Sequence, residues 1–358
     1  MQLKYSYTND NLSFIEAIEI GGVNSAIKII VQTSSRQSPT NWITEELISI
    51  IKLEQSSIVL NFSKAINPLH LNIFIDPLEN STDISVKIQH LKPLENNIIL
   101  NRLKNRTIAF LGCARNIAPN IADSLNILHK LGALFKKYSI YVFENDSNDN
   151  SRQLLINYEN NNEIKLIYED DVELKLPQRT DRIAYARNKL REVALKNNYD
   201  FYAPVDLDGV ITSSDKIESL ISPFEFEDVW DACFPVNRDF YYDIWALRAS
   251  GLLETDYMDL YHRIPSAIKA DKALAAVIQP AQSLINKDLR GWIQVQSAFG
   301  GLAYYKSEAY LNANYAGNID GGILCEHVYL NQKLISQNKK LYICPKFEIT
   351  GLTRNYSH

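Results

Sequence analysis

The sequence lacks the features that mark membrane-spanning, exported and nucleic-acid-binding proteins. Nowhere in the 358 residues is there a run of about 18 apolar residues, so no membrane-spanning helix is expected. The first residues, Met-Gln-Leu-Lys-Tyr-Ser-Tyr, contain no apolar core of a signal peptide. The net charge is −5 and no long Lys/Arg face occurs, so nucleic acid is not an expected partner. We therefore predict a cytoplasmic protein and leave peripheral contact with a membrane open.

Cysteine is scarce, and its spacing is not that of a metal or disulfide framework. The four cysteines are scattered along the chain without a Cys-x-x-Cys pair. This favours buried free thiols over a zinc site or disulfide bonds. The residues are Cys113, Cys233, Cys325 and Cys344.

Residues 1–100 carry short β-type runs separated by polar turn segments. Spacing of this kind is typical of an antiparallel sheet or sandwich. We expect a β-rich, sandwich-like accessory domain here, without a catalytic constellation. A structural or oligomerisation module is the simpler interpretation, and a carbohydrate-binding module is the alternative. The expected strands are 26–32, 57–62, 71–75 and 84–90.

A different pattern follows a polar linker at 92–106. Apolar strands alternate with segments whose apolar residues recur at helical spacing, which indicates an α/β fold with a mostly parallel sheet. We place this second domain at 105–358. Its first strands are expected at 107–112, 139–143, 164–168 and 201–205, and its first helices at 120–137, from 150 and at 181–197. Later strands are expected at 230–236, 239–247, 295–305 and 341–344, and later helices within 251–289 and at 325–337.

The most informative motif is Asp206-Leu207-Asp208, which follows the apolar run of the fourth strand of this domain. Residues i and i+2 of a strand point to the same side, so the two carboxylates can hold one hard divalent cation. The remaining coordination positions would be left for water and phosphate oxygens. The alternative is a solvated turn or a helix cap.

Two further polar clusters follow earlier strands, and ligands of such sheets bind beyond the carboxyl ends of the strands. Ala114, Arg115 and Asn116 follow the first strand and could meet a nucleotide or its phosphates; an ordinary strand-to-helix loop is the alternative. Glu144 and Asp146 follow the second strand and could accept hydrogen bonds from a ribose or a base; a capping turn is the alternative.

Arginines and glycines complete the set of candidate donor-binding residues. Arg179, Arg182 and Arg187 precede the Asp206 strand and could face a diphosphate, with Arg187 the strongest candidate. Gly300 and Gly301 interrupt an apolar strand, which suggests either the close approach of a sugar ring or a β-bulge.

The helix expected near 325 begins with a candidate catalytic residue. Glu326 could orient an acceptor hydroxyl, act as its base, or bind the donor sugar. His327 and His358 are candidates for a further metal ligand, since imidazole is acceptable to manganese. A structural role is the simpler interpretation of either histidine taken alone.

Taken in order, these motifs resemble those of glycosyltransferases of the GT-A fold. Within that fold the chain is similar to the CAP59-like (capsule-associated) α-1,3-mannosyltransferase family over roughly residues 107–350, and residues 1–100 lie outside the resemblance. The matching residues are Arg115, Asn116, Glu144 to Ser147, Arg179, Arg187, Asn188, Asp206, Asp208, Trp230, Asp231, Tyr242 to Arg248, Gly300, Gly301 and Cys325 to His327.

The resemblance implies a UDP- or GDP-linked sugar donor, a divalent metal (Mn²⁺, or Mg²⁺) and a saccharide acceptor. The metal aspartates of the family map onto Asp206 and Asp208, and its C-terminal acidic position maps onto Glu326. The family leans towards retention of the anomeric configuration. The expected function is thus a hexosyltransferase, similar to mannosyltransferases, that acts in surface polysaccharide or glycan synthesis.

Two other functions compete with this expectation. A sugar nucleotidyltransferase would need a Gly-rich basic loop after the first strand, where Gly112 is the only glycine before Arg115. A non-catalytic glycan-binding protein would not need Asp206 and Asp208.

Overall fold

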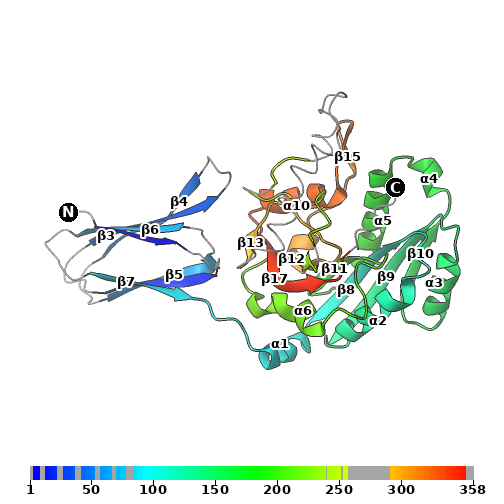
Figure 1. The fold of residues 1–358 in the computed structure, drawn as a ribbon, viewed down its shortest axis with the longest axis horizontal. Helices are drawn as coiled ribbons and strands as arrows, with labels where there is room; N and C mark the ends of the chain where they lie inside the picture. Colours follow the sequence, from blue (N-terminus) through cyan, green and yellow to red (C-terminus); the bar gives the residue numbers. More distant parts are fainter. Residues whose placement is uncertain are drawn as a thin grey trace. The chain divides into compact units, whose positions relative to one another are not determined.

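A computed structural model of the chain describes residues 3–8, 13–21, 27–36, 42–52, 57–66, 70–77, 84–238, 240–250, 253–256 and 291–351. The chain divides into two compact units, each with its own internal contacts (Figure 1). The first comprises Met1–Pro93 with Ser250–Leu252 and Arg290–Ile293, and the second comprises Leu94–Ala249, Leu253–Leu289 and Gln294–His358. The domain limits expected from the sequence, 1–100 and 105–358, stay predictions.

The first unit contains two antiparallel sheets, with strand orders β1-β6-β3-β4 and β5-β2-β7. Alternate residues of the strands face inward, so Ile29 and Val31 of one sheet and Ile18 and Ile20 of the other share one buried cluster. The strands are β1 Leu3–Thr8, β2 Ile15–Gly21, β3 Ile27–Arg36, β4 Trp42–Lys52, β5 Ser57–Ile66, β6 His70–Pro77 and β7 Ser85–His90. The sequence pattern had located β3, β5, β6 and β7, and missed β1, β2 and β4.

The second unit contains an eight-stranded sheet of order β10-β9-β8-β11-β14-β12-β17-β13. The four strands β8 to β11 are parallel, β14 runs antiparallel to both of its neighbours, and β12 and β17 pair in parallel. The predicted α/β fold, with a mostly parallel sheet preceded by a small β-rich part, is confirmed. The strands are β8 Thr107–Ala114, β9 Lys137–Asn145, β10 Lys165–Glu169, β11 Phe201–Asp206, β12 Ala232–Asn237, β13 Ile293–Gln294, β14 Tyr304–Lys306 and β17 Leu341–Ile349.

Helices α2 and α5 cover opposite faces of this sheet (Figure 1). The helices are α1 Asn96–Leu103, α2 Ile121–Gly132, α3 Ser151–Asn160, α4 Val172–Lys175, α5 Arg179–Ala194, α6 Ile217–Ile221, η1 Ser222–Phe226 (a 3-10 helix), α9 Ser307–Tyr310 and α10 Glu326–Ser336. A small hairpin, β15 Asn318–Ile319 and β16 Gly322–Ile323, precedes α10. Within the described ranges, no helix is long and apolar enough to span a bilayer.

Several sequence-based expectations about elements were wrong. The expected linker at 92–106 contains α1. Of the strand expected at 239–247, residues 240–247 are irregular. Asn237 and Asp243 accept hydrogen bonds from the backbone N–H groups of Tyr242 and Ala246 and so compete with a strand ladder. In the strand expected at 295–305, only the last residues are extended, as β14. Most of the helical segment expected at 251–289 lies outside the described residues. All four cysteines are free, as predicted.

Candidate active site

The carboxyl ends of β8, β9 and β11 lie side by side at one edge of the large sheet. Asp206 at the end of β11 pairs in register with Cys113 of β8, and Ala114 at the end of β8 pairs with Glu144 of β9. The loops that follow β8 and β9 are also joined, because Asn116 donates its N–H to Ser147 Oγ at 3.0 Å. The fold therefore brings the three predicted polar clusters to one edge.

Glu144 does not face this edge as a ligand would require. Its side chain is fully buried, and its two carboxylate oxygens accept hydrogen bonds from the N–H of Ser147 and from Nε of Arg152. The carboxylate therefore closes the loop after β9, and contact of Glu144 with a ribose or base stays a prediction. Asp146, half-buried in the same loop, accepts a hydrogen bond from the backbone N–H of Glu173 in α4.

Arg115 and Arg182 converge on one carboxylate. Glu173 of α4 forms ion pairs with Arg115, which follows β8, and with Arg182 of α5, whose Nη2 lies 3.3 Å from Glu173 Oε1. Half of the Glu173 side chain is exposed. Because exposed ion pairs contribute little stability, an anionic ligand can compete with Glu173 for Arg115, which is 35% exposed. Arg182 is less open, because it is 12% exposed and also donates to the backbone carbonyls of Leu176 and Pro177.

Arg187 is an enclosed counter-ion rather than an exposed phosphate ligand. Its side chain is only 5% exposed, and it lies between Asp206 (Nη2 to Oδ1, 3.0 Å) and Glu326 (Nε to Oε1, 2.9 Å). The guanidinium carbon is also 4.8 Å from the centre of the Phe299 ring. A guanidinium held in this way fixes the two carboxylates. Contact of Arg187 with a diphosphate stays a prediction.

Negative charge exceeds positive charge around Arg187. Burial raises the pKa of Asp206 to about 7, and the carboxylates of Asp208, Asp243 and Glu326 add to the rise while Arg187 opposes it. Burial likewise raises the pKa of Asp243 to about 6. Desolvation by the surrounding protein also raises the pKa of Asp208, although its side chain is open to solvent. Arg187 is thus the counter-charge shared by several nearby carboxylates.

The two aspartates of the motif differ in what they can offer a cation. Both oxygens of Asp206 are engaged, one by Arg187 and the other by the hydroxyl of Tyr242 at 3.1 Å. Asp208 is exposed, and within the described part of the chain no other side chain donates a hydrogen bond to it. Asp208 is thus the carboxylate of the motif whose oxygens are left open. Tyr242 is among the residues that carry the family resemblance but was given no role, because an aromatic run carries no signal for where one hydroxyl points.

Gly300 and Gly301 allow protein segments, rather than a ligand, to approach. A Cβ on Gly301 would lie 2.1 Å from Val210 Cγ1 and 2.9 Å from the Tyr242 hydroxyl, and a Cβ on Gly300 would lie 3.0 Å from Pro235 Cγ. The carbonyl of Gly301 accepts the N–H of Asp206 at 2.8 Å. The glycine pair therefore anchors the motif strand, and the expected contact with a sugar ring is not what fills this space.

We expect Gly301→Ala to destabilise the protein and to weaken ligand binding at this edge. The backbone of Gly301 has φ +100°, which is strained for alanine, and the new methyl group would overlap Val210. Overpacking of this kind costs about 1–3 kcal/mol, measurable by urea denaturation. Gly321→Ala is the matched control, because Gly321 also has positive φ but its Cβ would meet no atom within 4 Å. Equal losses in the two variants would contradict the packing argument.

His327 does not join the aspartates as a metal ligand. The ring is buried and stacks on Phe299 at 3.7 Å between centroids. Burial, and secondarily the charge of Arg187, hold the pKa of His327 well below its usual value, so the imidazole is neutral. Among the residues that the structure describes, no group of three or more His, Cys, Asp or Glu side chains gathers to hold a metal ion. His358 lies outside the described residues.

Comparison with known proteins found similarity only to solved structures. No family model and no curated protein sequence matches the chain. The mannosyltransferase PcManGT of Pyrobaculum calidifontis, in complex with GDP-Man and Mn²⁺, is 14% identical with a TM-score of 0.44, over 70% of this chain and 59% of that one. Glucosyl-3-phosphoglycerate synthase of Mycobacterium tuberculosis, in complex with Mn²⁺, UDP-glucose and phosphoglyceric acid, is 13% identical with a TM-score of 0.41, over 75% and 79%. S. aureus TarS 1–349 is 12% identical with a TM-score of 0.36, over 66% and 60%. The narrower resemblance to the CAP59-like family stays a prediction.

Proposed function

We propose that the chain is a metal-dependent glycosyltransferase of the GT-A fold that moves a sugar from a nucleotide-diphosphate sugar to a saccharide acceptor. The observation that carries this proposal is the group of carboxylates around Arg187 (Asp206, Asp208, Asp243 and Glu326), with Asp208 exposed and left open to a cation. Carboxylates with vacant coordination positions are the usual protein ligands of divalent cations that bind substrate phosphates. The donor would be UDP- or GDP-linked, and the cation Mn²⁺ or Mg²⁺.

The surroundings of the two aspartates and of two arginines suggest a role for each of them. Asp208 would bind the cation directly, and Asp206 would support it from a position fixed by Arg187 and Tyr242. The bound cation would neutralise charge on the diphosphate as the bond between sugar and phosphate breaks. Arg115 and Arg182 would bind the donor phosphates, which would replace Glu173 as the partner of the two guanidinium groups.

Glu326 remains our candidate for contact with the acceptor or with the reacting sugar. It is 6% exposed, and its ion pair with Arg187 holds it in one position. A role in surface polysaccharide synthesis, a cytoplasmic location, peripheral membrane contact and oligomerisation through residues 1–100 stay predictions.

Isothermal titration with UDP and with GDP tests the proposal. We expect one of the two nucleotides to bind about tenfold or more tightly in Mn²⁺ than in EDTA, a difference of about 1.4 kcal/mol or more. Uridine and guanosine, which lack the diphosphate, should bind without metal dependence. If neither diphosphate binds, or if both bind equally with and without Mn²⁺, the proposed function is wrong.

A further inference from the structure

The loop that carries Asp208 lies outside the strand ladder, so other segments must hold its backbone. Residues 207–210 form turns beyond the end of β11. On one side, the buried hydroxyl of Ser124 in α2 contacts the carbonyl oxygens of Leu207 and Ile211 at 3.3 and 3.1 Å. These contacts bracket Asp208 but fix only one side of the loop.

The end of the last strand holds the other side of this loop. Gly351, just beyond β17, donates its N–H to the carbonyl of Val210 at 2.9 Å. Val210 is two positions from Asp208, although Gly351 is far away in the sequence. The backbone beyond β17 and the loop 207–212 are therefore direct neighbours.

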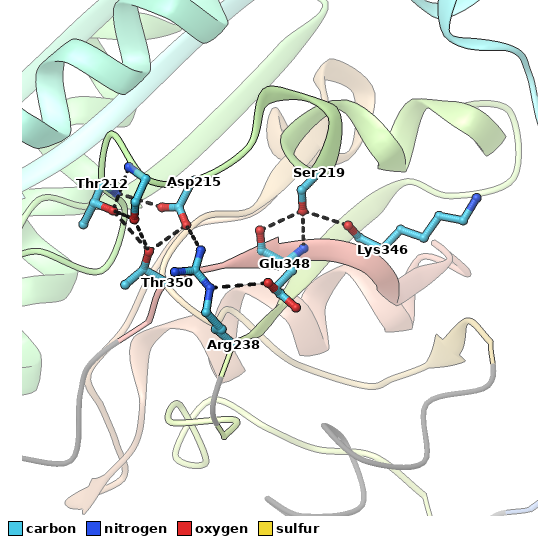
Figure 2. Close-up of polar contacts among 8 residues, drawn as sticks. Thr212, Asp215, Ser219, Arg238, Lys346, Glu348 and Thr350 are labelled. Carbon is cyan, nitrogen blue, oxygen red and sulfur yellow. Dashed lines mark hydrogen bonds and ion pairs between the residues drawn. The ribbon is translucent and has the colours of Figure 1, made fainter.

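Asp215 joins the same two segments through its side chain (Figure 2). One carboxylate oxygen accepts the N–H of Thr212 at 2.8 Å, and the other accepts the hydroxyl of Thr350 at 2.7 Å and Nη2 of Arg238 at 3.3 Å. The Asp215 side chain is fully buried. Hydroxyl contacts between Thr212 and Thr350, at 3.1 Å, add a second connection.

We propose that Asp215 and Thr350 are positioning residues for Asp208, so that the end of β17 supports the cation-binding loop. This inference rests on the proposed function for its ligand, but not for the contacts themselves. A buried carboxylate with all its oxygens satisfied orients its partners, and outer-shell partners of this kind set the geometry of ligands they do not touch. Both oxygens of Asp215 are engaged by protein groups, so its role in this proposal is positioning and not catalysis.

The chain contains a matched control for this inference. Ser219 also ties its segment to β17, since its hydroxyl contacts the carbonyl oxygens of Lys346 and Glu348, each at 2.8 Å, and accepts the N–H of Glu348 at 2.7 Å (Figure 2). Ser219 and Thr350 are both half-buried. Ser219 makes no contact with the loop 207–212 among the hydrogen bonds of the described residues. Removing the Ser219 hydroxyl should therefore weaken the attachment of β17 without freeing the loop 207–212 that carries Asp208.

The experiment compares Thr350→Val, Thr350→Ser and Ser219→Ala with the wild type. Hydrogen–deuterium exchange of peptides covering 207–215 reports on the loop directly and needs no ligand. Titration of UDP and GDP with Mn²⁺ reports on Asp208. We expect Thr350→Val to speed exchange in 207–215 and to raise the Kd of the Mn²⁺-dependent complex about tenfold, the lower end of what loss of an outer-shell partner costs. Thr350→Ser keeps the hydroxyl, so its exchange rate in 207–215 and its Kd should equal those of the wild type. Ser219→Ala should change neither the exchange rate nor the Kd.

The outcomes separate this inference from the proposed function. If Thr350→Val and Ser219→Ala change exchange in 207–215 equally, the Thr350–Asp215 contact is only general support of the fold and the inference is wrong. If exchange responds as expected but the wild type binds neither diphosphate with Mn²⁺, the contact exists and the proposed function fails instead. If exchange responds but the Mn²⁺-dependent Kd of Thr350→Val equals that of the wild type, the loop does not position Asp208.

Discussion

Replacing Asp208 with asparagine is expected to reduce sugar transfer by about 10³-fold, because a metal ion supplies several kcal/mol of transition-state charge stabilisation. Asparagine matches aspartate in shape but offers no negative charge to a divalent cation. The Asp208 side chain is exposed and has no partner side chain in the described part of the chain, so the fold should tolerate the change. The free energy of unfolding should stay within about 0.5 kcal/mol of the wild type. Donor hydrolysis with a panel of nucleotide sugars and urea denaturation measure the two effects.

A neighbouring acid serves as the control for loss of charge alone. Asp170 follows β10 at the same edge of the sheet, and its side chain is 69% exposed beside Arg152. Asp170→Asn removes the same charge but leaves the Asp206–Asp208 motif intact, so transfer should fall less than about twofold if the effect of Asp208→Asn is specific to metal binding. Full transfer by Asp208→Asn would overturn the proposed role of Asp208, whatever Asp170→Asn does.

The position of the candidate site could be predicted because its signals are local. Asp206 and Asp208 directly follow a buried run, and Arg115 and Asp146 follow earlier strands in the same alternating pattern. In a parallel sheet such strand ends lie at one edge, so the order of elements along the chain was enough to bring these residues together.

The contacts that shape the site could not be predicted, because they join segments far apart in sequence. Arg187 and Glu326 are separated by 139 positions, and Asp215 and Thr350 by 135. Neither pair leaves a periodic or compositional trace in the sequence. The glycines were noticed for the right reason, close approach, but a sequence does not say whether a ligand or Val210 fills the space.

The partners of Arg187 also come from distant segments, so the sequence alone could not show that Arg187 is a buried counter-ion. An arginine on a helix before a metal strand is equally compatible with an exposed phosphate contact and a buried counter-ion. Only the packing of Phe299 and Glu326 around it decides between them. The consequence is that Arg187 should matter more for stability than a surface ligand would.

Replacing Arg187 with methionine is expected to lower the free energy of unfolding by about 3–5 kcal/mol at neutral pH, the usual cost of breaking a buried ion pair by removing one partner. Methionine keeps much of the apolar side-chain volume, so the loss reports on Asp206 and Glu326 left without their cation. Arg191→Met is the matched control. Arg191 lies one turn further along α5 and donates to the backbone carbonyls of Tyr310 and Leu311, not to carboxylates. Arg191→Met should therefore lower the free energy of unfolding clearly less than Arg187→Met does.

The pH dependence of the stability lost in Arg187→Met tests whether that loss is electrostatic. Burial and carboxylate repulsion already hold the pKa of Asp206 at about 7 despite Arg187, and removing the guanidinium should raise it further. A carboxylate whose pKa is higher in the folded than in the unfolded state lowers stability as pH rises above its unfolded pKa of about 4. Asp206 is protonated in both folded proteins at pH 5, so the difference between Arg187→Met and the wild type should be larger at pH 7.5 than at pH 5. It should grow further as the pH rises from about 7 towards the higher pKa of Asp206 in the variant. Adding Glu326→Gln should recover part of the loss at pH 7.5. A loss equal at both pH values, and unchanged by Glu326→Gln, would show that Arg187 stabilises the protein by packing and not by charge.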